Sequence, residues 1–155
     1  MINLNEYKNN GYTIVKNFLT EDELTIAQHE AVKLKRWFDI FHKNGQLKNF
    51  GTGKYWKGIE MAGVLSKPLM DLYTSKKQYD LATQVLETSD IYLFNDEIVV
   101  KNPHEIFDFL IHTDNEFGPD PEAALRGDYR SVNICWMLDD ITETNGPISF
   151  LNKKT

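Results

Sequence analysis

The chain has 155 residues, of which 41% are hydrophobic and 26% charged, and its formal net charge is −6. This length suits one domain with a real core, and the acidic balance argues against nucleic acid as the main partner. The single cysteine, Cys135, excludes an internal disulfide and fits a reducing compartment. No apolar run approaches the ~18 residues of a membrane helix, and no signal-peptide pattern opens the chain. We therefore expect a cytoplasmic protein with no membrane partner.

The first half of the chain is predicted to be mainly helical. A β-branched and aromatic stretch at residues 12–18 is typical of a short strand. Thr20 and Glu23 then follow the capping-box pattern, which predicts a helix running to about residue 43. One apolar face is formed by residues at three- and four-residue steps: Leu24, Ala27, Ala31, Leu34, Phe38 and Phe41.

Two shorter helices are expected after a glycine-rich stretch. A loop with extended pieces is predicted at residues 46–65, because four glycines are spread among aromatic residues. Ser66 followed by Lys67-Pro68 indicates a helix start, since proline is favoured in a first turn. Another helix is predicted over about residues 76–87.

The second half of the chain has the character of β-structure. In residues 131–138, apolar residues alternate with others, so Val132, Ile134, Trp136 and Leu138 are expected on one face and Ser131, Asn133, Cys135 and Met137 on the other. One helical turn is expected at residues 122–126. Strands are predicted at residues 90–94, 97–101, 107–114, 131–138 and 148–151. Helices followed by strands predict an α+β fold, with N-terminal helices packed on an incomplete double-stranded β-helix of the cupin-like jelly-roll kind.

The sharpest candidate for chemistry is His112-Thr113-Asp114. Residues two apart on a strand point to the same face, so His112 and Asp114 would present an imidazole and a carboxylate side by side. Those are two of the three ligands in the facial triad of non-haem Fe(II) oxygenases. The tripeptide alone is a weak signal and favours a surface or edge-strand histidine next to an unrelated aspartate.

The motifs around it resemble the phytanoyl-CoA dioxygenase family, which includes ectoine hydroxylase. The resemblance rests on the order of a strand ending in a Lys-Asn-Pro turn, the HxD motif, a strand ending in Leu-Asp-Asp, and an Asn-Gly-Pro turn. The opening from Gly11 to Leu19 also fits. These segments are Val99-Val100-Lys101-Asn102-Pro103, His112-Thr113-Asp114, residues 133–140 and Thr144-Asn145-Gly146-Pro147.

The resemblance implies roles for named residues. His112 and Asp114 match the proximal iron ligands, and the co-substrate would be 2-oxoglutarate. Lys101 matches a basic residue near the co-substrate carboxylate, and Asn133 matches a polar residue that contacts co-substrate or substrate. For both, an ordinary structural role is the alternative. The intact Asp114 favours hydroxylation, because halogenases of this superfamily have a small residue there. The remaining histidines, His29, His42 and His104, are expected to be helix-surface or turn residues, and Trp136 a core residue.

The sequence departs from the family pattern after the turn. The family continues with a distal iron histidine and an arginine that binds 2-oxoglutarate, whereas no histidine follows Asp114 here. We therefore expect residues 1–155 to form a single, truncated domain. The alternatives are a non-catalytic binding module derived from that fold, and a metal protein completed by a neighbouring subunit. Half a jelly roll has an open sheet edge, so a homo-oligomer that covers the edge is also expected, as is a small-molecule substrate.

Overall fold

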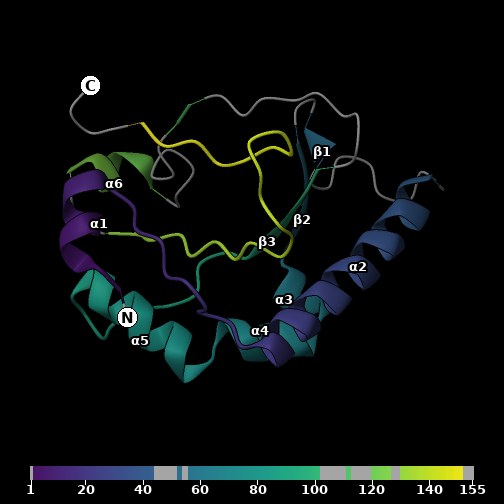
Figure 1. Ribbon diagram of the computed structural model, residues 1–155, viewed down its shortest axis with the longest axis horizontal. Helices are drawn as coiled ribbons and strands as arrows, with labels where there is room; N and C mark the ends of the chain where they lie inside the picture. The colour runs from purple at the N-terminus through teal and green to yellow at the C-terminus, as the bar shows by residue number, and fades with distance from the viewer. Residues whose placement is uncertain are drawn as a thin grey trace.

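Helices pack against a small antiparallel sheet in the computed structural model, which describes residues 2–43, 52–53, 56–101, 111–112, 120–126 and 130–151 (Figure 1). The α+β class predicted from the sequence is thereby confirmed. In chain order the elements are α1 (Leu4–Asn10), α2 (Glu21–Lys43), β1 (Thr52–Gly53), β2 (Trp56–Glu60), α3 (Ala62–Leu65), α4 (Lys67–Tyr73), α5 (Lys76–Leu86), β3 (Glu97–Val100) and α6 (Pro121–Arg126).

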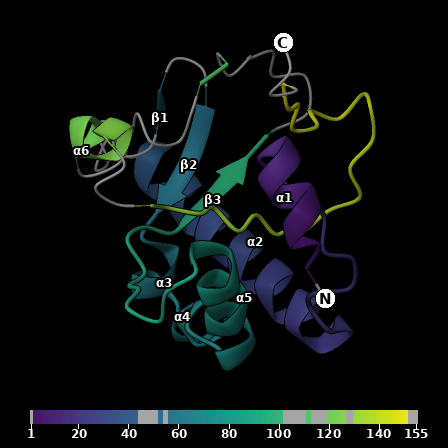
Figure 2. The ribbon, with the colours of Figure 1, turned by 90° about the vertical axis from the view of Figure 1, so that its left-hand side faces the viewer.

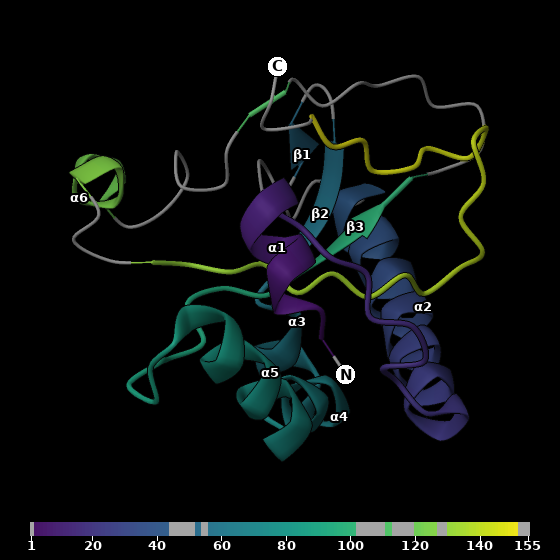
Figure 3. The same cartoon turned by 60° about the vertical axis from the view of Figure 1, so that its left-hand side comes forward.

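The sheet has the strand order β1-β2-β3, and both pairings are antiparallel. Ile59 on β2 lies opposite Ile98 on β3, and both side chains are buried. Helix α2 runs behind the strands in Figure 2, with α3, α4 and α5 below them. Helix α6 lies apart from these packed helices (Figure 3). Within the described ranges, no helix is long and apolar enough to cross a membrane.

The core joins α2, α3 and α4 to the sheet. The predicted apolar face of α2 is confirmed, because Ala27 and Leu34 are buried while Ala31 and Phe38 pack against the same cluster. Leu69 of α4 is nearly inaccessible, at 1% exposure. The core cluster consists of Ala27, Leu34, Ile59, Ala62, Leu69 and Ile98.

The predicted start of α2 is confirmed in atomic detail. The backbone N–H of Thr20 donates to Glu23 Oε2 at 2.8 Å, and the N–H of Glu23 donates to Thr20 Oγ1 at 3.2 Å. These reciprocal bonds satisfy two of the backbone donors that a helix start leaves unpaired. The Lys77 ammonium of α5 donates to the Glu23 carboxylate and lowers its pKa, so the capping box also ties α5 to α2.

The helix start predicted at Ser66 is also confirmed, and the Ser66 side chain contacts α2. Ser66 Oγ accepts the N–H of Leu69 at 3.4 Å and donates to Glu30 Oε2 at 2.8 Å. Glu30 is 5% exposed, and its carboxylate also contacts Lys33, whose Nζ lies 3.0 Å from Oε2, and His29, whose Nδ1 lies 3.2 Å from Oε1. The Ser66 hydroxyl, followed by the Lys33 ammonium, lowers the pKa of Glu30. A buried carboxylate thus links two helices through a capping hydroxyl.

The other helical predictions are confirmed, and two helices were missed. Helix α5 matches the segment predicted at 76–87, and α6 matches the predicted turn, with Asp120 Oδ1 accepting the N–H of Ala123 at 2.9 Å. The short helices α1 and α3 were not predicted. Residues 46–65 contain the expected extended pieces, β1 and β2. Asn44-Gly45, a pair typical of a helix C-cap, follows α2 and lies outside the described residues.

Four predicted strands are corrected. The segments at 12–18, 90–94, 131–138 and 148–151 do not form strands, whereas β3 confirms the prediction at 97–101. Alternation of apolar residues specifies which side is buried, but a strand also needs a neighbouring backbone in register. In 131–138 the burial does alternate as expected, since Val132, Ile134, Trp136 and Leu138 are partly buried and their neighbours are exposed. The described strands by themselves do not establish a jelly roll.

Candidate functional site

Two motif segments that are far apart in sequence meet at Lys101. This residue directly follows β3, and its ammonium donates to the backbone carbonyl of Gly146. Gly146 has φ +83°, and a Cβ there would lie 2.7 Å from Lys101 Cδ and 2.8 Å from Nζ. The left-handed backbone therefore favours glycine, and a side chain there would also displace the end of the flexible lysine. The structure gives Lys101 a role in holding the Asn-Gly-Pro turn.

Asn145 holds the same turn from within. Its Oδ1 accepts the backbone N–H of Thr142 at 2.8 Å, and its Nδ2 donates to the carbonyl of Asp140 at 2.6 Å. The side chain thus connects the Asp-Asp end of the motif segment to the Asn-Gly-Pro turn. Both motifs are recognisable in the sequence, but the hydrogen bonds by which Asn145 connects them were not predicted. Asparagine in a turn commonly bonds nearby backbone, which is the signal that could have revealed it.

His112 is exposed and lies in a segment without regular structure. Its neighbours Thr113 and Asp114 lie outside the described residues, as does most of the strand predicted at 107–114. The side-by-side placement of His112 and Asp114 therefore stays a prediction from sequence. In the part of the chain that the structure describes, no three His, Cys, Asp or Glu residues come together as a metal-binding group.

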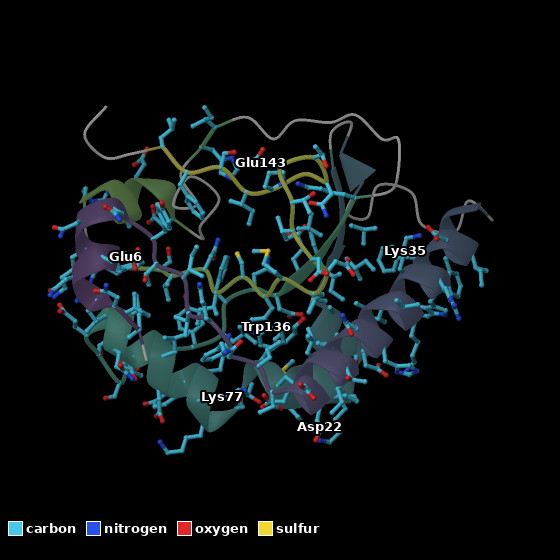
Figure 4. All side chains as sticks on the ribbon, viewed as in Figure 1. Glu6, Asp22, Lys35, Lys77, Trp136 and Glu143 are labelled. Atoms are coloured by element: carbon cyan, nitrogen blue, oxygen red, sulfur yellow. The ribbon has the colours of Figure 1, made fainter. Side chains whose placement is uncertain are left out.

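Asn133 lies on the exposed side of residues 131–138, opposite the partly buried side that carries Trp136. The prediction that Trp136 belongs to the core is confirmed, because it packs against the core cluster. Its ring lies 5.1 Å from that of Tyr73, and Figure 4 shows it directed from its segment toward the helices. Trp136 thus fixes the face on which Asn133 is presented.

Burial is the main cause of the raised pKa values of two acidic groups, Tyr73 and Glu97. Burial, with a smaller contribution from Asp96, raises the pKa of Tyr73 to about 12, so its hydroxyl is neutral at physiological pH. Burial also raises the pKa of Glu97, helped by the negative charge of Glu60, which lies opposite it across the sheet. Two carboxyl groups therefore share one end of the β2–β3 ladder.

The other histidines do not complete a metal site among the described residues. His29 is exposed on α2, as predicted, with Nδ1 3.2 Å from Glu30 Oε1. The His42 side chain and all of His104 lie outside what the structure describes. An imidazole and a carboxylate are the right donor types for Fe(II), but two donors are one fewer than the facial triad requires.

Comparison with known proteins decides the family. The family model described as phytanoyl-CoA dioxygenase matches residues 7–153, nearly the whole chain. The chain belongs to the phytanoyl-CoA dioxygenase family. The resemblance seen in the sequence is therefore confirmed. Searches of curated proteins and of solved structures gave no significant match. Within this phytanoyl-CoA dioxygenase family member, Lys101 and Gly146 join two of the motifs on which the resemblance rested.

Proposed function

We propose that this protein is an Fe(II)- and 2-oxoglutarate-dependent oxygenase that hydroxylates a small molecule. The observation that carries the proposal is the family match over residues 7–153. His112 and Asp114 would be two of the iron ligands, and the third would come from outside the described residues or from a second copy of the chain. When bound, the iron and 2-oxoglutarate would supply the oxidising chemistry, while the protein positions them.

Lys101 and Asn133 are proposed to contact the co-substrate or substrate. Lys101 brings a positive charge to the end of β3, where its ammonium already binds a carbonyl oxygen. A carboxylate is a stronger acceptor than a carbonyl, so an anionic co-substrate could compete for this ammonium. Asn133 is exposed on the face of its segment opposite Trp136. The intact Asp114 supports hydroxylation as the outcome.

The competing function is a binding module that retains this fold without catalysis. It is favoured by the exposure of His112 in a segment without regular structure. The two functions differ in one measurable property, which is whether His112 is needed to bind Fe(II).

The deciding experiment is an anaerobic titration of the purified protein with Fe(II) and 2-oxoglutarate. The oxygenase should develop the weak visible charge-transfer band of the ternary complex, and His112→Ala and Asp114→Ala should each abolish it. His29→Ala is the matched control, because that imidazole is exposed on α2 and paired with Glu30, and it should keep the band. A parent protein without the band, or a His112→Ala variant that retains it, would contradict the proposal.

Lys101→Met tests the second part of the proposal in the same titration. The variant should need more 2-oxoglutarate to develop the band while its affinity for Fe(II) alone stays unchanged. Lys67→Met is the control, since Lys67 is an exposed lysine paired with Asp71 on α4. If Lys101→Met and Lys67→Met give the same 2-oxoglutarate affinity, Lys101 serves the turn and not the co-substrate.

A further inference from the structure

The exposed turn at residues 142–146 contains an asparagine followed by a glycine, Asn145-Gly146. An Asn-Gly pair can undergo an intramolecular reaction between its backbone and the asparagine side chain. The backbone nitrogen of the residue after an asparagine can attack the side-chain amide carbon, and glycine obstructs the attack least because it has no side chain and the freest backbone. The question is whether this turn permits the attack.

The folded turn holds the amide that would react. Asn145 Oδ1 accepts from Thr142 at 2.8 Å and Nδ2 donates to Asp140 at 2.6 Å, so both ends of the amide are engaged with backbone. The following residue is held as well, since Lys101 binds the Gly146 carbonyl. The attack requires the amide to turn toward the Gly146 nitrogen, and these bonds oppose that rotation. Reaction therefore requires the turn to open.

We propose that Asn145 is a deamidation site whose rate is set by opening of this turn. In the first step the Gly146 backbone nitrogen bonds to Asn145 Cγ, the Cγ–Nδ2 bond breaks, and the backbone proton leaves with the departing ammonia. Water then opens the resulting succinimide at either carbonyl, which gives aspartate or isoaspartate. The sequence consumes one water and releases one ammonia, and no atom is oxidised or reduced.

The product cannot restore the original turn. An aspartate at position 145 still accepts the Thr142 N–H, but it has no donor for the Asp140 carbonyl and adds a negative charge next to that oxygen. Two acceptor oxygens have no hydrogen bond to make with each other, and in this exposed turn water replaces the lost donor. The Asp140 end of the turn is therefore released. The isoaspartate product also lengthens the backbone by one atom at the position that Lys101 holds.

The test compares the deamidation rate of Asn145 in the native protein and in urea, at the same pH and temperature. Peptide mapping by mass spectrometry follows the mass increase and separates the isoaspartate product. Two ordinary hydrogen bonds should slow the native reaction roughly 10- to 50-fold relative to the unfolded chain. Asn10-Gly11 and Asn44-Gly45, the two other Asn-Gly pairs in the chain, report the intrinsic rate in urea. Equal native and unfolded rates at Asn145, or no isoaspartate in urea, would overturn the proposal.

Thr142→Pro provides a second, independent test. It removes the N–H that binds Asn145 Oδ1, but it leaves the Asn-Gly pair unchanged and lies in an exposed turn. The ratio of unfolded to native rate should fall several-fold in this variant, while the rate in urea matches the parent. If the ratio is the same as in the parent, these hydrogen bonds do not control the reaction.

Discussion

Gly146 shows how one residue joins two distant parts of this protein. Its φ of +83° is a backbone conformation that L-residues with side chains rarely adopt, and its carbonyl receives the Lys101 ammonium. The bond spans 45 residues of sequence and attaches the end of β3 to the turn after residues 131–138. A single glycine therefore satisfies a backbone requirement and a tertiary contact.

Gly146→Ala should destabilise the protein by about 1–2 kcal/mol, because the alanine must adopt a left-handed conformation. Crowding against Lys101 should add to this cost. In Gly146→Ala/Lys101→Ala the crowding is gone and only the backbone cost stays, so the two substitutions should be less than additive in urea unfolding. Strict additivity of the two free-energy changes would mean that Lys101 and Gly146 are not in contact in solution.

At the scale of an element, residues 131–138 form an extended segment with one partly buried face and one exposed face. Trp136 packs against the core and Tyr73, whereas its neighbour Met137 is 48% exposed. Among the described residues, the indole N–H of Trp136 is buried without a hydrogen-bond partner. Packing and a hydrogen bond from Gln28 Nε2 of α2 to the Leu138 carbonyl, at 2.6 Å, attach this segment to the helices.

Trp136→Ala should therefore cost about 3 kcal/mol, and Met137→Ala less than about 0.5 kcal/mol. The two substitutions are adjacent and both shorten a large side chain, so each serves as the control for the other. Chemical denaturation monitored by far-ultraviolet circular dichroism gives both values. Similar costs for the two variants would show that the segment does not keep this alternation in solution.

Helices α2 and α4 are joined through the Glu30 carboxylate, and this contact makes their packing sensitive to acid. The pKa of Glu30 is lowered in the folded protein, so the contact stabilises the fold above the ordinary glutamate pKa of about 4.3. That contribution is lost as the pH falls through the lower, folded value. Glu23 responds in the same direction, because the Lys77 ammonium lowers its pKa.

Glu30→Gln should lower the free energy of unfolding at neutral pH by about 1–3 kcal/mol, the range for a buried charged hydrogen bond. It should also flatten the decline in stability below about pH 4.3. Glu21→Gln makes the same change at an exposed position of α2 and should have the parent's stability at neutral pH. The measurement is urea unfolding over a series of pH values. A Glu30→Gln variant with the parent's acid dependence would refute the assignment.

At the scale of the whole molecule, several large apolar side chains among the described residues are exposed. Ile14, Tyr92 and Ile111 are 73%, 76% and 78% exposed, and Leu151 is 63% exposed. They come from segments that were predicted as strands. Exposed apolar surface of this kind commonly marks an interaction site. We therefore propose self-association, in line with the open sheet edge expected from the sequence.

The weight-average mass should accordingly rise with protein concentration in sedimentation equilibrium. Tyr92→Ser should weaken that rise, because it removes a highly exposed aromatic ring. Lys67→Met, which changes an exposed residue of α4, should not weaken it. A mass equal to that of one chain at all accessible concentrations would exclude self-association and leave these side chains to another partner.

The sequence by itself determined the local features of this protein. Helix starts at Thr20 and Ser66 were predictable because a cap bonds residues only three positions away, and the bonds are present. The apolar face of α2 followed from its 3.6-residue period. Family membership could be recognised because it rests on the order of short motifs. Candidate ligands His112 and Asp114 could be named from sequence, but their geometry could not.

Only the tertiary structure decided which segments meet. Four stretches with strand-like sequence do not form strands, because a strand depends on a partner whose position no local pattern specifies. The binding of Lys101 to Gly146 and of Ser66 to Glu30 spans 45 and 36 residues, and neither contact has a sequence signature. Such contacts arise from the packing of whole elements. The physical reason is that local hydrogen bonds are specified by neighbouring residues, whereas long-range bonds are specified by the fold.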